Sequence, residues 1–176
     1  MATGDLTAQK RATDWNFLEV ASIEEGAGLA AGIKIFHFHS PTARVAGVVS
    51  FMGAGRGVAE SFKVSQKGAA VILELLSQTR AAKVGPVSVP LRPPYATKEL
   101  SRHFIPFSLD DLHSANGTVL SVGGGVIFGG GLTQAIAVKD GRQLFECARI
   151  ALDIGRFGVG ATELKGKWSL WASWQL

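Results

Sequence analysis

Two runs of three glycines, Gly123–Gly125 and Gly129–Gly131, lie inside a 23-residue stretch that carries no charge, Asn116–Val138. The length of this stretch would allow a membrane-spanning helix. Each glycine in a helix interior, however, costs up to about 1 kcal/mol relative to alanine in water. We therefore expect the stretch to form β-strands joined by turns.

The composition of the whole chain also favours β-structure. Glycine accounts for 22 of the 176 residues, and charged residues make up only 18%. Few charges, many glycines and alternating apolar residues are typical of short strands joined by turns. The segment Gly32–His39 alternates in this way. One face would carry Ile33, Ile35, His37 and His39, and the other would carry Lys34, Phe36 and Phe38.

A repeated pattern predicts that the chain contains two related units. The pattern A-R-[VI]-A-x-x-[VI]-x-x-x-G-x-G begins at Ala43 and again at Ala148. We expect one domain over residues 1–176, with unit one at 15–65, a connector at 66–116 and unit two at 117–176. Four short strands in each unit predict a mainly β fold, a β-barrel or β-sandwich of about eight strands.

The connector differs from both units. Residues 66–80 favour a helix, and residues 108–113 favour a short helix with Ser108 as its N-cap. Five prolines between these helices argue against a long regular element there.

Basic residues gather in the connector. Between residues 78 and 103 the chain carries five basic residues and one acidic residue, Glu99. The basic residues are Arg80, Lys83, Arg92, Lys98 and Arg102. Because the net charge is +4, this segment predicts contact with an anionic membrane surface or an acidic protein partner. No specific nucleic-acid motif is present.

Tryptophan is concentrated near the C-terminus, at Trp168, Trp171 and Trp174. On a regular strand, Trp168 and Trp174 share one face and Trp171 takes the other. These residues predict either a binding surface with one dry and one wet side or a last strand with Trp168 turned inward.

Histidines and arginines supply the enzymatic alternative. His37 and His39 have a spacing that can bind a metal, but a metal site needs at least one further protein ligand, so we expect no metal and no cofactor. A small enzyme would place its site around His37, His39 and Arg44, with His103 as a further candidate. The repeat makes Arg44 equivalent to Arg149, and both are expected to form salt bridges.

The segments Lys34–Pro41 and Ala148–Trp168, with Gly158-Val-Gly160 and Gly166-Lys-Trp168, resemble the virulence-associated (Vap) surface-protein family of actinobacterial pathogens. That resemblance implies a small glycine-rich duplicated barrel with a non-enzymatic, host- or membrane-directed role. The family supplies no agreed catalytic residues to carry over.

The leading functional prediction is therefore a non-enzymatic binding or membrane-interacting module, such as an effector or a virulence-associated protein. The alternatives are a subunit of a larger assembly, with an oligomer possible, and the small enzyme described above. Residues Met1–Asp14 contain no apolar run of the kind found in signal peptides, which predicts a cytoplasmic protein or one exported by a non-classical route.

Overall fold

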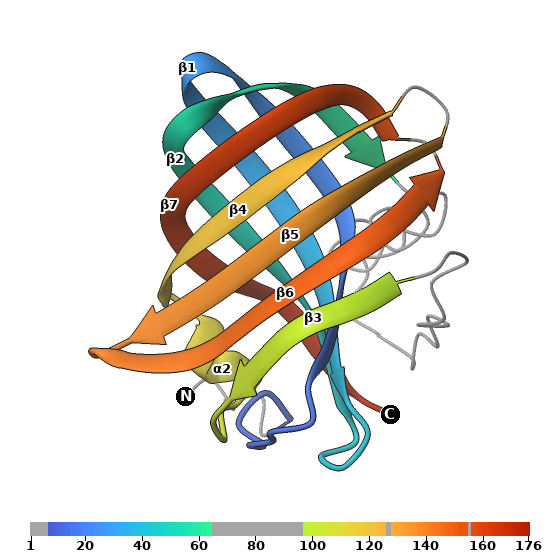
Figure 1. Cartoon of the computed structure of the whole chain (residues 1–176). Helices are drawn as coiled ribbons and strands as arrows, with labels where there is room; N and C mark the ends of the chain where they lie inside the picture. The colour runs from blue at the N-terminus through green and yellow to red at the C-terminus, as the bar shows by residue number, and fades with distance from the viewer. Residues whose placement is uncertain (1–6, 65–96, 126–127, 155) are drawn as a thin grey trace, which may run out of the picture.

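The computed structural model describes residues 7–64, 97–125, 128–154 and 156–176. The predicted helix at 66–80 and the predicted contacts Arg80, Lys83 and Arg92 lie outside these ranges. The described elements are one short helix and seven strands (Figure 1). They are β1 (Asn16–Ser40), β2 (Val45–Val64), β3 (Thr97–Phe104), α2 (Leu109–Leu112), β4 (Asn116–Gly125), β5 (Phe128–Lys139), β6 (Arg142–Ile154) and β7 (Arg156–Gln175).

The strands form one antiparallel sheet in the order β1-β2-β7-β4-β5-β6-β3. The uncharged glycine-rich stretch forms β4 and β5, which pair with each other, so the expected strands are confirmed. Asp140 and Gly141 connect β5 to β6, and both have positive φ, 51° and 75°. This is the backbone of a tight two-residue hairpin turn.

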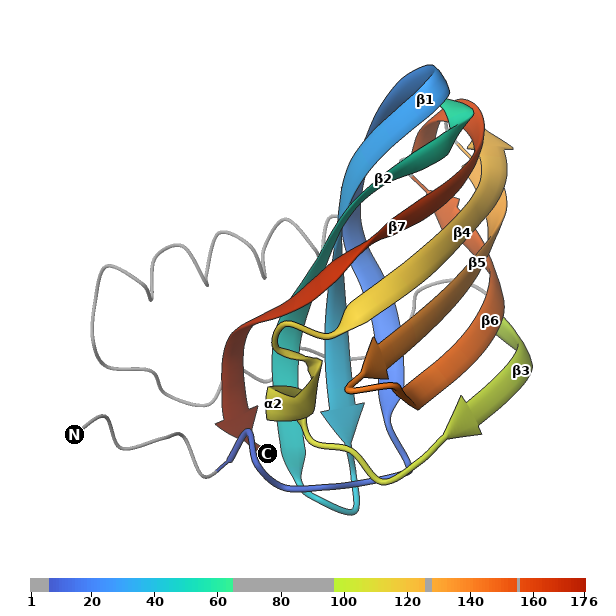
Figure 2. The same ribbon diagram turned by 90° about the vertical axis from the view of Figure 1, so that its left-hand side faces the viewer.

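The three longest strands, β1, β2 and β7, arch over the end of the molecule opposite α2 (Figures 1 and 2). Glycines in β2 make the arch possible. A β carbon at Gly55 would overlap the carbonyl oxygen of Glu163 in β7, and one at Gly57 would overlap that of Ala161. Gly57 also has a φ of 153°, which L side chains rarely adopt. Only glycine therefore allows β2 and β7 to pack this closely along the bend.

The curved sheet surrounds an aromatic core. Phe36, Phe38 and Phe51 point inward together with Trp168, and all four are fully buried. The predicted alternation is thus confirmed, because Lys34, Phe36 and Phe38 share the inner face. Leu109 and Leu112 of α2 join this core from the turn end of the sheet.

Helix α2 begins where the sequence predicts. The Ser108 hydroxyl accepts a hydrogen bond from Asp111 N at 3.2 Å, and the Asp111 carboxylate accepts one from Ser108 N at 2.9 Å. These reciprocal bonds form a capping box, which satisfies two backbone groups at the helix start.

The prediction of a mainly β fold is confirmed, but the sheet does not close into a barrel, which corrects the barrel alternative of the predicted β-barrel or β-sandwich. In the described part of the chain, β1 and β3 share no backbone ladder. Arginine side chains of β3 and β6 bridge this seam, to β1 and to the residue before it. Arg102 Nη2 donates to Trp15 O at 2.7 Å, and Arg149 Nη1 donates to Phe17 O. The guanidinium groups also lie over the rings of Phe104 and Phe17, at 4.5 and 4.8 Å from the ring centroids.

The structure does not show the predicted duplication. Unit one contributes two long strands, whereas unit two contributes four. Arg44 lies in the turn between β1 and β2 with a φ of 54°, whereas Arg149 lies within β6. The connector also contributes β3 to the sheet. Strands of alternating small and apolar residues have similar sequences wherever they occur. The residues that match between the two predicted units can therefore lie at structurally different places, as Arg44 and Arg149 do.

Candidate functional site

Three neighbouring rungs on the outer face of the sheet each cross five strands, β1, β2, β7, β4 and β5. We call these fifteen residues the lysine face. The first rung is Ile33, Met52, Lys167, Asn116 and Val138; the second is Ala31, Ala54, Lys165, Thr118 and Ile136; the third is Leu29, Arg56, Glu163, Leu120 and Gln134.

Large apolar side chains are exposed at the β1–β2 side of the lysine face. Leu29 is 82% exposed, Met52 63% and Ile33 39%. Scattered exposed apolar residues are ordinary on protein surfaces, whereas exposed apolar residues that touch one another mark a candidate contact surface. Ile33 and Met52 are register partners, so the two side chains belong to one patch.

Positive charge lies next to this patch. Met52 pairs with Lys167 and Ala54 pairs with Lys165, while Arg56 pairs with Glu163. The ion pair between Lys165 and Glu163 is long, at 4.0 Å, and both side chains are more than half exposed. Such a pair leaves the lysine available to an external anion. With three basic residues and one acidic residue, the face carries a net charge of +2.

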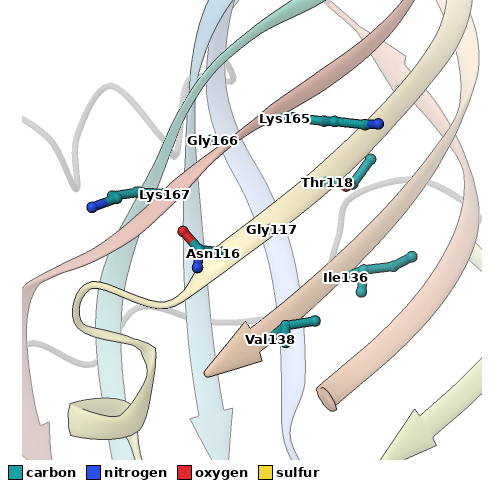
Figure 3. Close-up of a pocket in the computed structure, with 8 residues that line it drawn as sticks. All are labelled: Asn116, Gly117, Thr118, Ile136, Val138, Lys165, Gly166 and Lys167. Atoms are coloured by element: carbon teal, nitrogen blue, oxygen red, sulfur yellow. The ribbon is translucent and has the colours of Figure 1, made fainter. Parts of the chain in front are cut away.

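A groove of about 480 Å³ lies on the same face, across β7, β4 and β5 (Figure 3). It is lined by Asn116, Gly117, Thr118, Ile136, Val138, Lys165, Gly166 and Lys167. The lining comes from β7 on one side, from Asn116 and Thr118 of β4 in the middle, and from Ile136 and Val138 of β5 on the other side. Lys165 extends over β4, whereas Lys167 extends in the opposite direction (Figure 3). This volume is within the range of small-ligand sites in proteins.

A second polar cluster lies inside the fold. Lys34 is only 1% exposed, and its Nζ lies 3.1 Å from Glu24 Oε1 and 3.8 Å from Glu19 Oε2. Thr162 Oγ1 donates to Glu24 at 2.7 Å, and Thr133 Oγ1 donates to Glu19 at 3.4 Å. Buried charges require partners of this kind, so the cluster explains how Lys34 is accommodated.

Two further atoms of this inner layer have no hydrogen-bond partner among the described residues. They are Ser121 Oγ and Arg149 Nε. Ser121 is the register partner of both Thr133 and Thr162. Sequence reasoning missed this layer, because its members come from five strands whose pairing no local pattern reveals.

The histidines lie away from the lysine face. His37 is buried, and its ring lies 5.5 Å from that of Trp174. Burial, together with the nearby His39, lowers the pKa of His37 to about 4. Burial also lowers the pKa of His39, despite the opposing charge of Asp14.

The residues of the enzymatic alternative are dispersed. Arg44 is exposed and donates to the carbonyl of Leu176 at 3.3 Å, and His103 lies on β3 and is exposed. Within the described ranges, no three His, Cys, Asp or Glu side chains come together to hold a metal ion. The one cysteine, Cys147, belongs to the core, and burial raises the pKa of its thiol.

Of the two arginines that the sequence pattern matches, Arg44 and Arg149, only Arg149 forms the expected salt bridge in the described structure. Arg149 Nη2 lies 2.9 Å from Glu99 Oε2. Arg44 has a carbonyl partner instead, which agrees with its position in a turn.

The predicted tryptophan surface is only partly formed. Trp168 is fully buried, with its Nε1 donating to Ile136 O at 3.1 Å, and Trp171 is 49% exposed. Trp174 faces His37 on the outer side, so it does not share a face with Trp168. The reason is a bulge: Val49 pairs with Leu170 but Val48 pairs with Ala172, which shifts the alternation by one residue.

The basic connector residues separate into two roles in the described part of the chain. Lys98 is exposed on β3. Arg102 is also exposed, but its guanidinium donates a hydrogen bond to Trp15 O across the seam, so its charge helps to hold the fold together. The sequence did not single out Lys165 and Lys167, since only strand pairing places them beside Met52.

Comparison with known proteins identifies no relative: no family model, curated protein or solved structure matches the chain. The resemblance to the virulence-associated proteins stays a prediction. Among the described residues, no helix is long and apolar enough to cross a membrane.

Proposed function

We propose that this protein is a non-enzymatic binding module that docks on an anionic lipid surface through its lysine face. The observation that carries this proposal is the exposed pair Ile33 and Met52 beside Lys167. Lys165 lies on the next rung of the same face, and the exposed Leu29 lies one rung further, beside Arg56. Apolar side chains with neighbouring cations match the two parts of a lipid interface, the acyl boundary and the anionic headgroups.

Both parts contribute to the free energy of docking. Removing apolar surface from water contributes about 25 cal/mol per Å². Each lysine near an anionic membrane contributes about 1 kcal/mol. The five strands hold these side chains on one continuous sheet, so docking requires no folding step and little ordering of the backbone.

The test is co-sedimentation with phosphatidylcholine vesicles, with and without phosphatidylserine, at low and physiological salt. We expect binding only to the anionic vesicles, weaker at higher salt because exposed charges are then screened. Lys165→Gln/Lys167→Gln should weaken binding roughly thirtyfold, the equivalent of about 2 kcal/mol. Leu29→Ser/Met52→Ser should weaken binding but preserve its salt dependence.

Two control variants distinguish this face from other basic residues. Lys10→Gln removes an exposed lysine outside the face, and Lys98→Gln removes the exposed lysine of the predicted basic connector. Neither should change binding appreciably. If Lys98→Gln alone abolishes sedimentation, the connector is the docking surface. If anionic vesicles never bind, the lipid proposal is wrong, and an acidic protein partner or an assembly role becomes the better candidate.

A further inference from the structure

The outer face carries a further rung beyond the third rung of the lysine face, on the side away from α2 (Figure 1). We call it the apolar rung, because each of its described side chains is apolar. Its members on β1, β7, β4, β5 and β6 are Ala27, Ala161, Val122, Leu132 and Ile150. Val122 is 44% exposed and Ile150 40%, and both alanines are exposed. Four neighbouring strands thus present apolar side chains at one level of the sheet.

Polar residues stand next to the apolar rung along the same strands, and they face the interior. On β7, β4, β5 and β6 they are Thr162, Ser121, Thr133 and Arg149. Thr162 and Ser121 are almost completely buried. Thr133 donates a hydrogen bond to Glu19, and Arg149 donates one to Phe17 O. At this level the sheet is therefore polar inside and apolar outside.

Nearer α2, the same strands alternate in the opposite sense. Leu164 of β7 is buried and Lys165 is exposed, while on β4 Val119 is buried and Thr118 belongs to the lysine face. A sheet with one face in water keeps its apolar residues inside and its polar residues outside. Strands that cross a lipid bilayer show the reverse, with apolar residues outside and polar residues inside. The reversal at the apolar rung therefore favours contact with lipid there.

Charged residues limit how much of the apolar rung can enter lipid. Lys98 of β3 pairs with Ile150, and the exposed Glu25 lies two residues beyond Ala27 on β1. Because charge is costly in hydrocarbon, both ends of the rung should stay in water and its centre, Val122 and Leu132, should reach deepest. A membrane-crossing strand needs about nine to eleven residues. One rung instead matches the shallow insertion of interfacial elements, about 5–10 Å.

The lysine face lies at a suitable distance from the apolar rung. Lys165 is four residues along β7 from Ala161, and Lys167 is six residues away. These intervals correspond to about 13 and 20 Å at the usual rise of a strand. A tilted molecule can therefore hold the apolar rung at the acyl boundary and the two lysines at the level of the anionic headgroups.

We propose that the apolar rung is the part of the protein that penetrates deepest into a lipid layer, with Val122 and Leu132 at the acyl boundary. This inference rests on the proposed lipid docking and adds a second contact to it. The lysine face contacts the headgroups, and the apolar rung contacts the hydrocarbon. Leu29, in the third rung of the lysine face, lies between these two levels.

Depth-dependent fluorescence quenching tests the inference. A fluorophore is attached at Val122→Cys or at Met52→Cys, selectively because the native Cys147 is fully buried. The vesicles contain phosphatidylcholine and phosphatidylserine, with a nitroxide quencher either on the acyl chain or on the headgroup. We expect the label at position 122 to be quenched more strongly by the acyl-chain nitroxide. The label at position 52 should be quenched more strongly by the headgroup nitroxide, because Met52 lies beside Lys167.

A binding measurement provides an independent test. Val122→Ser should weaken co-sedimentation with the anionic vesicles about fivefold and preserve its salt dependence, because less apolar surface leaves water on docking. Leu176→Ser is the matched control. It removes a side chain that is 43% exposed, near the turn between β1 and β2, and should leave binding unchanged. Thermal unfolding of both variants checks that the fold is preserved.

Each result has a definite meaning. Quenching at position 52 without quenching at position 122 overturns the inference and leaves docking through the lysine face intact. Quenching at position 122 alone supports the inference and removes the lysine face as a contact. Failure to bind any anionic vesicle overturns both. If Val122→Ser leaves vesicle binding unchanged but alters the sedimentation coefficient of the free protein, the apolar rung joins two copies of the chain, and the inference is wrong.

Discussion

At the scale of single residues, the side chains under the strictest constraint are polar groups that are buried away from water. Lys34 shows how burial is tolerated when partners are present, because two carboxylates surround its ammonium group. His37 shows the opposite case. Both of its ring nitrogens are buried and have no hydrogen-bond partner within the described structure. A buried imidazole of this kind must stay neutral, which links folding to pH.

We predict that protonation of His37 destabilises the fold as the pH falls below about 6.5. The pKa of His37 is about 4 in the folded protein and near 6.5 when unfolded. Between these values the unfolded chain binds the proton more tightly, so the stabilising contribution is present above pH 6.5 and is lost progressively toward pH 4. The loss amounts to at most about 3 kcal/mol.

Urea unfolding at pH 7 and pH 5 measures this effect, with His37→Phe as the comparison. The variant should lose less stability over this interval than the parent protein. Part of the loss remains in the variant, because burial also lowers the pKa of His39. Asp14 does not confuse the result. Although burial opposes it, hydrogen bonds from Ser40 and Thr42 hold the pKa of Asp14 below its usual value of 3.8. The contribution of Asp14 is therefore lost only at lower pH. Equal losses in the two proteins would show that His37 titrates freely.

At the scale of elements, the two edge strands of the sheet are joined by side chains rather than by a ladder. Arg102 reaches from β3 to the carbonyls of Trp15 and Thr13, at 2.7 and 3.3 Å. These bonds occupy carbonyl acceptors in the segment just before β1, which would otherwise face solvent or another chain. The stability of this edge should therefore depend strongly on the few side chains that cross the seam.

Arg102→Gln should therefore lower the free energy of unfolding by about 1–3 kcal/mol, the range for losing hydrogen bonds to a charged group. Amide hydrogen exchange should increase mainly in β3 and in the first part of β1. Lys98→Gln, on the same strand, provides the matched control and should change stability by less than about 0.5 kcal/mol. If the two variants melt alike, the seam contributes little to stability.

Local patterns identified several elements correctly. The alternation over 32–39 and the capping serine at 108 each depend on neighbours within a few residues, and the structure confirms both. The face assignment of Trp174 failed, because the bulge near Leu170 depends on the pairing of β7 with β2. Positions of that kind cannot be derived from one strand alone.

At the scale of the whole molecule, strand order decides which residues meet. β2 lies between β1 and β7, so Met52 stands between Ile33 and Lys167, although these three residues span most of the sequence. Neither the lysine face nor the buried Lys34 cluster can be recognised from the sequence of any single segment. The predicted basic connector, by contrast, is a cluster of charged residues close together in the sequence. Of its two described members, Arg102 forms hydrogen bonds across the seam instead.

The lysine face predicts one orientation of the molecule at a membrane. Leu29 and Met52 should enter the lipid interface, whereas β3 should stay in water. Single cysteines at 29, 52 and 101 can carry an environment-sensitive fluorophore selectively, because the native Cys147 is fully buried. With anionic vesicles, we expect blue-shifted emission for labels at Leu29→Cys and Met52→Cys, since the probe moves into an apolar medium. Ser101→Cys, on the exposed β3, should show no shift. A shift at position 101 alone would mean that the protein docks through β3, and the lysine face would then not be the membrane contact.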